Sequence, residues 1–201
     1  MKRLLYATGN SSKVYTMRRR LAGQMVEVLT PSDAGVQLHV EENGATPVEN
    51  ALIKARAYYA ATGITAIAGD SAFYIDGLPA AQQPGLHVRR VDGRELSDEE
   101  LIIHYAALAR GMGGSVPARF VTGMALVDAS GEKTVLIPES ARLLTDHPLK
   151  DYPHQGDPLA ALCIDPGTGK YIAQLTDAEE LALDEPFEKA CMAFLREALA
   201  E

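Results

Sequence analysis

Residues 4–13 read Leu-Leu-Tyr-Ala-Thr-Gly-Asn-Ser-Ser-Lys, an apolar run that stops abruptly at a glycine and a group of small polar residues. A short strand that breaks in this way and restarts as a helix predicts a phosphate-binding loop. Gly9 allows close approach of the backbone, and a helix N-terminus carries partial positive charge. Lys13 would lie about one turn into that helix, within reach of an oxyanion. The alternative is an ordinary strand-to-helix loop in which Asn10 or Ser11 caps the helix.

The composition is that of a soluble globular chain that is long enough to form a core. Of 201 residues, 47% are hydrophobic and 23% are charged. The net charge of −8 argues against a nucleic-acid or anionic membrane surface. It does not exclude a small anionic ligand, because acidic proteins usually bind phosphate through a divalent metal and a few placed cations.

The sequence predicts no membrane span and no signal peptide. No apolar window approaches about 18 residues, and the N-terminal apolar run is far too short for a secretory signal. Cys163 and Cys191 are isolated in apolar surroundings, which is typical of buried thiols in a reducing compartment. We therefore expect a cytoplasmic protein.

Capping signals predict several helices. Thr46-Pro47-Val48-Glu49 is a capping box with proline at the first helical position, and the helix should run to about residue 61. Ser97-Asp98-Glu99-Glu100 opens a second helix, to about residue 110, and Thr176-Asp177-Ala178-Glu179 opens a shorter third. A core-facing helical stripe closes the chain: Phe187, Ala190, Cys191, Phe194, Leu195 and Ala198.

The strand pattern predicts an α/β fold. Candidate strands lie at residues 3–7, 25–30, 64–68, 116–128, 133–143 and 160–164. The first three alternate with helices, whereas the fourth and fifth form a long hairpin. We expect one domain over residues 1–201, with a central mixed, twisted sheet flanked by helices and a hairpin-bearing second lobe. A cleft between two such lobes commonly holds a ligand.

Two acidic groups flank the helix that begins near Pro47. Glu41 and Glu42 precede it, and Asp70 follows the short strand after it. A carboxylate at a strand end with a second from a nearby loop is a plausible Mg²⁺ site, because magnesium takes few carboxylates plus water and phosphate oxygens. Lys54 lies on an otherwise apolar helix face, where a solvated lysine is unexpected. The alternatives are solvated loop charges and an aspartate that caps a turn.

Several blocks in this order resemble the inosine triphosphate pyrophosphatase (Ham1-like) family. The first is residues 7–13, and the second and fairly specific one is Glu42-Asn-Gly-Ala-Thr-Pro-Val-Glu-Asn-Ala-Leu-Ile-Lys-Ala55. Further along come Ala68-Gly-Asp-Ser71, then Pro84-Gly85 and Arg90, and more weakly Ala118-Arg-Phe120 and Gly156-Asp-Pro158. The resemblance covers most of the chain.

The resemblance implies an enzyme that hydrolyses a nucleoside triphosphate to the monophosphate and pyrophosphate with Mg²⁺ in a cleft, and that forms a homodimer. Carried onto this chain, it makes Glu42 and Asp70 the metal ligands and Lys54 a catalytic cation, with Asp70 also orienting or deprotonating the attacking water. The implied substrate-binding residues are Thr8, Gly9, Asn10, Lys13, Ser71, Arg90 and Asp157.

The chain also departs from the family pattern. Where the family has two adjacent aspartates, this chain has Gly69-Asp70. An aromatic-glycine-aromatic motif becomes His154-Gln-Gly156, and a Lys and a Ser-His-Arg set fall on Leu181 and Glu185-Pro-Phe187. These losses indicate an altered base pocket, because aromatic stacking is removed.

The leading hypothesis is therefore a Mg²⁺-dependent nucleotide pyrophosphatase with a rebuilt base pocket. The alternatives are a nucleotide-binding relative without catalysis, and a phosphohydrolase acting on a modified or pyrimidine nucleotide or a monophosphate.

Overall fold

The computed structural model describes residues 1–150, 157–183 and 185–200. Its elements, in chain order, are β1 (Lys2–Tyr6), α1 (Ser11–Arg20), β2 (Val26–Leu29), α2 (Pro47–Thr62), β3 (Ala66–Ile75), β4 (Arg90–Val91), β5 (Arg94–Glu95), α3 (Asp98–Gly111), β6 (Ser115–Asp128), β7 (Gly131–Thr145), β8 (Cys163–Ile164), α4 (Asp177–Leu183) and α5 (Glu185–Ala198). Short 3-10 turns lie at Ala80–Gln82, Pro158–Ala161 and Ile172–Gln174.

A mixed sheet of six strands is the centre of the fold. The strand order is β2-β1-β3-β6-β7-β8, with β1 parallel to β2 and β3, and β7 antiparallel to β8. A separate two-stranded ribbon is formed by β4 and β5. This arrangement confirms the predicted α/β class with a mixed central sheet and helices beside it.

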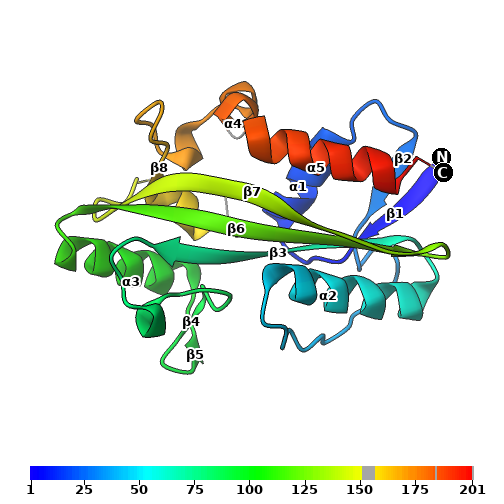
Figure 1. Cartoon of the computed structure of the whole chain (residues 1–201), viewed down its shortest axis with the longest axis horizontal. Helices are drawn as coiled ribbons and strands as arrows, with labels where there is room; N and C mark the ends of the chain where they lie inside the picture. Colours follow the sequence, from blue (N-terminus) through cyan, green and yellow to red (C-terminus); the bar gives the residue numbers. More distant parts are fainter. Residues whose placement is uncertain (151–156, 184, 201) are drawn as a thin grey trace. The chain divides into compact units, whose positions relative to one another are not determined.

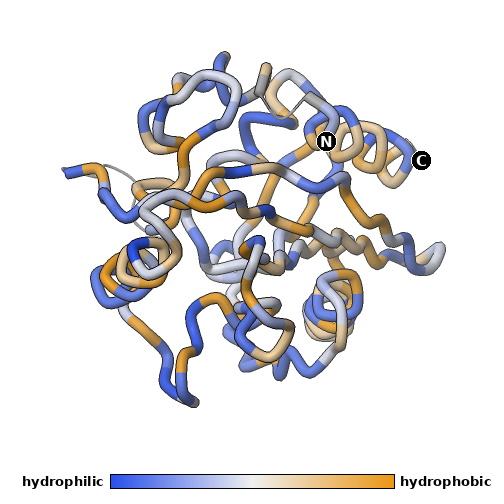
Figure 2. The backbone as a smooth tube through the Cα atoms, turned by 60° about the vertical axis from the view of Figure 1, so that its left-hand side comes forward, coloured by the Kyte–Doolittle hydropathy of each residue, from blue (hydrophilic) through white to orange (hydrophobic). Residues whose placement is uncertain are grey.

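The contacts group into two compact units, and three long strands pass through both. Unit 1 comprises residues 1–71, 122–137 and 190–201, and unit 2 comprises residues 72–121 and 138–189. In each unit helices pack on the sheet, and the helices carry hydrophobic and hydrophilic residues around each turn (Figure 2).

Unit 1 is built from helices on both faces of its strands. Figure 1 shows α2 on one side of β3 and β6, and α1 and α5 on the other. On the α2 side, Ala51, Ala55 and Tyr58 pack against Ala66 and Ala68. On the other side, the thiol of Cys191 in α5 lies 3.6 Å from the sulfur of Met124 in β6.

The helix caps explain why α2 and α3 begin where the sequence predicts. The Thr46 hydroxyl accepts a hydrogen bond from the Glu49 amide at 3.2 Å, and Gly63 ends α2 with a φ of 66°. Ser97 and Glu100 form a reciprocal capping box at α3. In unit 2, α3 contributes Tyr105 to a core that contains Phe73, with ring centroids 5.8 Å apart.

Two strand predictions need correction, and one ribbon was not predicted. The strand predicted at 64–68 runs from Ala66 to Ile75, because β3 continues beside β6 through the turn-forming run Gly69-Asp70-Ser71. Most of the strand predicted at 160–164 is a 3-10 turn that begins at Pro158, and only Cys163–Ile164 pairs as β8. The β4–β5 ribbon was not predicted, although Asp92-Gly93 is a typical two-residue hairpin turn.

Both cysteines are buried, as the sequence predicts, with exposed fractions of 1% for Cys163 and 0% for Cys191. Burial raises the pKa of the Cys163 thiol to about 12. We expect neither thiol to be alkylated by iodoacetamide in the native protein at about pH 8, and both to react after unfolding. Intact-mass spectrometry checks this, and rapid labelling of the native chain would contradict it.

The same shift gives a pH dependence of stability. Because the folded pKa of Cys163 lies above that of the unfolded thiol, which is near 9, the free energy of unfolding should fall as pH rises from about 9 to about 12.

Candidate active site

Lys54 of α2 pairs with two carboxylates that are distant in sequence. Its Nζ lies 2.8 Å from Glu42 Oε2 and 3.3 Å from Asp70 Oδ1. The side chains of Lys54 and Asp70 are 13% and 14% exposed, whereas that of Glu42 is 40% exposed. The structure therefore brings together the three residues for which catalytic roles were predicted, with Glu42 on the open side.

Asn50 is a fourth member of this cluster that the sequence reading missed. Its Nδ2 donates to Asp70 Oδ2 at 3.0 Å, and its Oδ1 accepts from the Gly44 amide at 2.8 Å. The side chain is only 2% exposed. Asn50 thus holds the Asp70 carboxylate and also ties the loop that carries Glu42. The signal was available, because Asn50 and Lys54 are four residues apart on one helix face.

Close backbone packing sets the position of α2 against β6. A methyl carbon built on Gly123 of β6 would lie 2.4 Å from the Val48 amide nitrogen and 2.6 Å from the Pro47 carbonyl carbon. A hydrogen in place of a side chain is what allows this approach. Gly123 therefore fixes the start of the helix that carries Asn50 and Lys54.

The strand β3 places Asp70 and its neighbour Gly69 on opposite faces. Asp70 faces α2, where it meets Asn50 and Lys54. A Cβ on Gly69 would instead lie 3.6 Å from the Tyr6 hydroxyl, with Met124 the next side chain. The acidic residue missing at Gly69 is therefore not a missing member of the Lys54 cluster, and ordinary contact distances leave room for a side chain there.

In the loop after β1, Asn10 is the N-cap of α1. Its side-chain oxygen accepts hydrogen bonds from the amides of Ser12 at 2.9 Å and Lys13 at 3.2 Å. The Asn10 amide in turn donates to the Thr8 hydroxyl at 3.1 Å. The amides of Asn10, Ser12 and Lys13 are therefore already hydrogen-bonded within the predicted phosphate-binding loop. The prediction of a phosphate here then depends more on the side chain of Lys13.

The loop begins where β1 ends, beside the middle of the parallel strand β3, in which Asp70 lies. Tyr6 pairs with Ile67, and the Ala7 amide donates to the Ile67 carbonyl at 2.8 Å. After this point β1 ends and β3 continues through Asp70, so Thr8 and Gly9 begin beside that stretch of β3. The carboxyl ends of parallel strands are the usual place for a phosphate ligand in α/β folds.

The remaining predicted residues either make other contacts or lie in unit 2. Ser71 pairs its hydroxyl with that of Thr122 on β6 at 2.8 Å. Arg90 lies on β4, and exposed Asp157 precedes the 3-10 turn at Pro158, both in unit 2. Their predicted roles remain predictions. The substituted motif at 154–156 lies outside the described residues, as do the side chains of Leu181 and Glu185.

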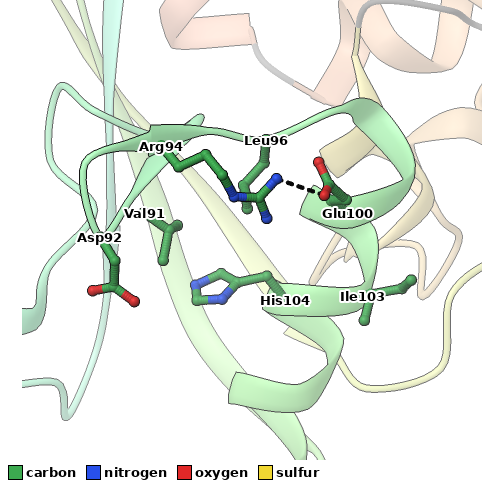
Figure 3. A pocket seen from close by; sticks show the side chains of 7 residues that line it. All are labelled: Val91, Asp92, Arg94, Leu96, Glu100, Ile103 and His104. Carbon is green, nitrogen blue, oxygen red and sulfur yellow. Dashed lines mark hydrogen bonds and ion pairs between the residues drawn. The ribbon is translucent and has the colours of Figure 1, made fainter.

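Unit 2 contains a hollow whose lining residues differ from those of the Lys54 cluster. The ribbon and α3 form it, and Figure 3 shows Arg94 pointing to Glu100, with which it pairs at 2.6 Å. Its lining is Val91, Asp92, Arg94, Leu96, Glu100, Ile103 and His104. None of the predicted site residues is among them, so this hollow is not the candidate active site.

The donor set around Lys54 fits a magnesium ion. Glu42 Oε2 and Asp70 Oδ1 lie 2.8 Å and 3.3 Å from Lys54 Nζ, so two carboxylates from different elements approach one cationic group. Two carboxylates with one open side suit Mg²⁺, which keeps several waters and binds substrate phosphates. We infer that Glu42 and Asp70 are the residues that would hold it.

Comparison with known proteins places the chain in a family. Residues 4–143 match the model of the Ham1 family. The chain belongs to the Ham1 family. This confirms the resemblance that was based on residues 7–13, the Glu42–Ala55 block and residues 68–71.

Similar curated proteins are dITP/XTP pyrophosphatases. The one from Xanthomonas axonopodis pv. citri is 45% identical over 93 residues, which are 46% of this chain and 45% of that protein. The one from Xanthomonas oryzae pv. oryzae is 42% identical over 118 residues, 59% and 56% of the two chains. The chain thus spans about half the length of the curated relatives it matches.

Solved Ham1 structures share the fold along nearly the whole chain. The HAM1 protein of Coxiella burnetii superposes with a TM-score of 0.73 at 25% identity, covering 98% of this chain and 100% of that one. The Mycobacterium abscessus nucleoside-triphosphatase (dITP/XTP pyrophosphatase) gives 0.66 at 28% identity, with 96% and 98% covered. The Staphylococcus aureus Ham1 protein, at 24% identity and a TM-score of 0.72, supports the fold.

Proposed function

We propose that this Ham1 chain is a Mg²⁺-dependent nucleotide pyrophosphatase that hydrolyses a nucleoside triphosphate to the monophosphate and pyrophosphate. The observation that carries the proposal is the contact of Lys54 with both Glu42 and Asp70 at the end of β1 where the Thr8–Lys13 loop begins. The dITP/XTP pyrophosphatases among its relatives support the reaction type.

The reaction needs charge neutralisation and an oriented water more than covalent help. Bound Mg²⁺ would supply charge neutralisation on the phosphate oxygens. Lys13 and Lys54 would neutralise further phosphate charge, and Thr8 and Asn10 would orient the phosphates. Asp70 would hold the attacking water and take its proton. The water oxygen forms a bond to the α-phosphorus while the bond from that phosphorus to the bridging oxygen breaks. Pyrophosphate then leaves with the bridging oxygen.

The base pocket is proposed to differ from the family pattern. The substitutions at His154, Gln155 and the 181–187 segment motivate this, because they remove aromatic and cationic residues. We propose that the chain accepts a different range of bases from its relatives but binds the phosphates of the nucleotide in the same way as they do. A homodimer in the cytoplasm remains part of the proposal. Among the described residues, no helix is long and apolar enough to cross a bilayer.

A nucleotide panel with Mg²⁺ tests the proposal. Purified protein is mixed with purine, pyrimidine and deaminated nucleoside triphosphates, including dITP and XTP, and pyrophosphate release is followed with Mg²⁺ and with EDTA. We expect release from at least one triphosphate, lost in EDTA. Release of neither pyrophosphate nor phosphate across the panel, together with no effect of Asp70→Asn, would overturn it.

A non-catalytic nucleotide-binding role is the second candidate. It rests on the missing acidic residue at Gly69 and on the missing cations near the C-terminus. A side chain at position 69 would point away from the Lys54 cluster, so the first of these weighs less. Tight nucleotide binding without turnover in the same panel would favour it. Turnover of monophosphates or modified pyrimidine nucleotides alone would favour the third hypothesis.

A further inference from the structure

Lys54 is the cation that Glu42 and Asp70 hold in this structure, and the same two residues would hold a divalent cation. Its Nζ is an ion-pair partner of Glu42 Oε2 and of Asp70 Oδ1 at once. A metal ion held by the same two carboxylates would lie near the ammonium group. Two cations at such a distance repel strongly when the site is partly buried, as the 13% exposure of Lys54 shows it to be.

We propose that Lys54 competes with the divalent cation for Glu42 and Asp70, so that metal binds tightly only together with phosphate. The inference rests on the proposed function, because a triphosphate is the ligand that would draw Lys54 away. Phosphate oxygens give Lys54 a new anionic partner and give the metal further oxygen ligands. Metal and nucleotide binding are then coupled, and each strengthens the other.

Asn50 allows a metal to replace Lys54 without moving the two carboxylates. Asp70 Oδ2 stays bonded to Asn50 Nδ2, and Gly44 stays bonded to Asn50 Oδ1, so neither carboxylate depends on Lys54 alone for its position. When Lys54 leaves, Asp70 keeps its orientation and the loop that carries Glu42 stays anchored. The carboxylates are thus held for a cation whether the cation is Lys54 or a metal.

Mn²⁺ titrations without nucleotide test the competition. The aquo-Mn²⁺ signal in electron paramagnetic resonance measures free ion beside wild type and Lys54→Met. We expect Lys54→Met to bind Mn²⁺ about tenfold more tightly, because the competing charge is gone while both carboxylates remain. Lys54→Arg keeps the charge and should bind Mn²⁺ no more tightly than wild type.

A matched control separates local competition from net charge. Lys133 is in the same unit, and its ammonium donates to the Glu197 carbonyl. Lys133→Met removes the same charge and should leave Mn²⁺ affinity unchanged. Adding Glu42→Gln to Lys54→Met should abolish the gain, because the metal then loses an oxygen ligand.

Three results would overturn the inference. They are an unchanged or weaker Mn²⁺ affinity in folded Lys54→Met, an equal gain in Lys133→Met, and a gain that survives Glu42→Gln. Circular dichroism checks folding, and Lys54→Gln replaces Lys54→Met if the latter is unfolded. Because no nucleotide is present, failure here leaves the hydrolysis assay intact, and failure of hydrolysis leaves the Mn²⁺ comparison intact.

Discussion

Replacing Asp70 by Asn is expected to lower kcat for pyrophosphate release at least about 100-fold, the usual scale for loss of a catalytic acid or base. The amide cannot take a proton from water and is a weaker metal ligand than the carboxylate. The measurement is the steady-state rate of pyrophosphate release with Mg²⁺, beside a thermal melt that shows the variant is folded.

The local contacts limit how much stability this change costs. Asn50 Nδ2 can still donate to the amide oxygen at residue 70, but the amide NH₂ then faces the ammonium group of Lys54. One donor–donor contact replaces one mostly buried ion pair, while Lys54 keeps Glu42 as a partner, so we expect a loss of about 2 kcal/mol in the free energy of unfolding.

Asp76→Asn is the matched control. Asp76 follows the same strand, is 56% exposed and pairs with Arg119 at 2.7 Å. The substitution makes the same chemical change outside the Lys54 cluster, so kcat should stay near wild type. Equal losses in the two variants, or no loss in Asp70→Asn, would remove Asp70 from the mechanism.

Among glycine-to-alanine substitutions in unit 1, Gly123→Ala should lower the free energy of unfolding the most. Its Cβ would lie 2.4 Å and 2.6 Å from backbone atoms of Val48 and Pro47, and backbone cannot move aside as a flexible side chain can. We expect a loss of about 3 kcal/mol in the free energy of unfolding, at the upper end for overpacking. For a chain of 201 residues this is about 6–12 °C in Tm.

The same displacement should reach the site, because Asn50 and Lys54 lie in the first two turns of α2. Gly111→Ala is the control, since a Cβ at the end of α3 meets nothing within 4 Å. Alanine there should be neutral or stabilising by up to about 1 kcal/mol. Calorimetry on both variants decides, and a Gly123→Ala variant as stable as Gly111→Ala would show that α2 does not press on β6.

Much of this site could be predicted because chemistry and local signals agree. The Thr46 N-cap starts α2 one turn before Asn50. A lysine on an otherwise apolar helix face, Lys54, indicates a charged partner. Three residues far apart in sequence, Glu42, Lys54 and Asp70, were predicted to act together and do meet.

The failures come from tertiary pairing that no local pattern reports. Gly69-Asp70-Ser71 has the composition of a turn, yet β3 runs through it. A strand end predicted there put Asp70 at an edge, whereas it lies inside a long strand beside the point where β1 stops. That placement decides which way Gly69 and Asp70 point, and so which of the two belongs to the cluster.

The loop around Asn10 shows a second limit of prediction from the sequence. The Thr-Gly-Asn-Ser-Ser-Lys loop predicts both a phosphate cradle and a capped helix, and the two readings use the same amides. The structure gives those amides to Asn10, so the cationic side chain of Lys13 carries the phosphate argument instead.

The most direct test of the central claim is the product of hydrolysis, followed by ³¹P nuclear magnetic resonance with Mg²⁺ and a triphosphate that the nucleotide panel shows to be hydrolysed. A pyrophosphatase built on Glu42, Lys54 and Asp70 should yield the monophosphate and pyrophosphate in equal amounts, and Asp70→Asn should leave the triphosphate intact. Formation of the diphosphate and orthophosphate, or identical spectra from wild type and Asp70→Asn, would contradict it.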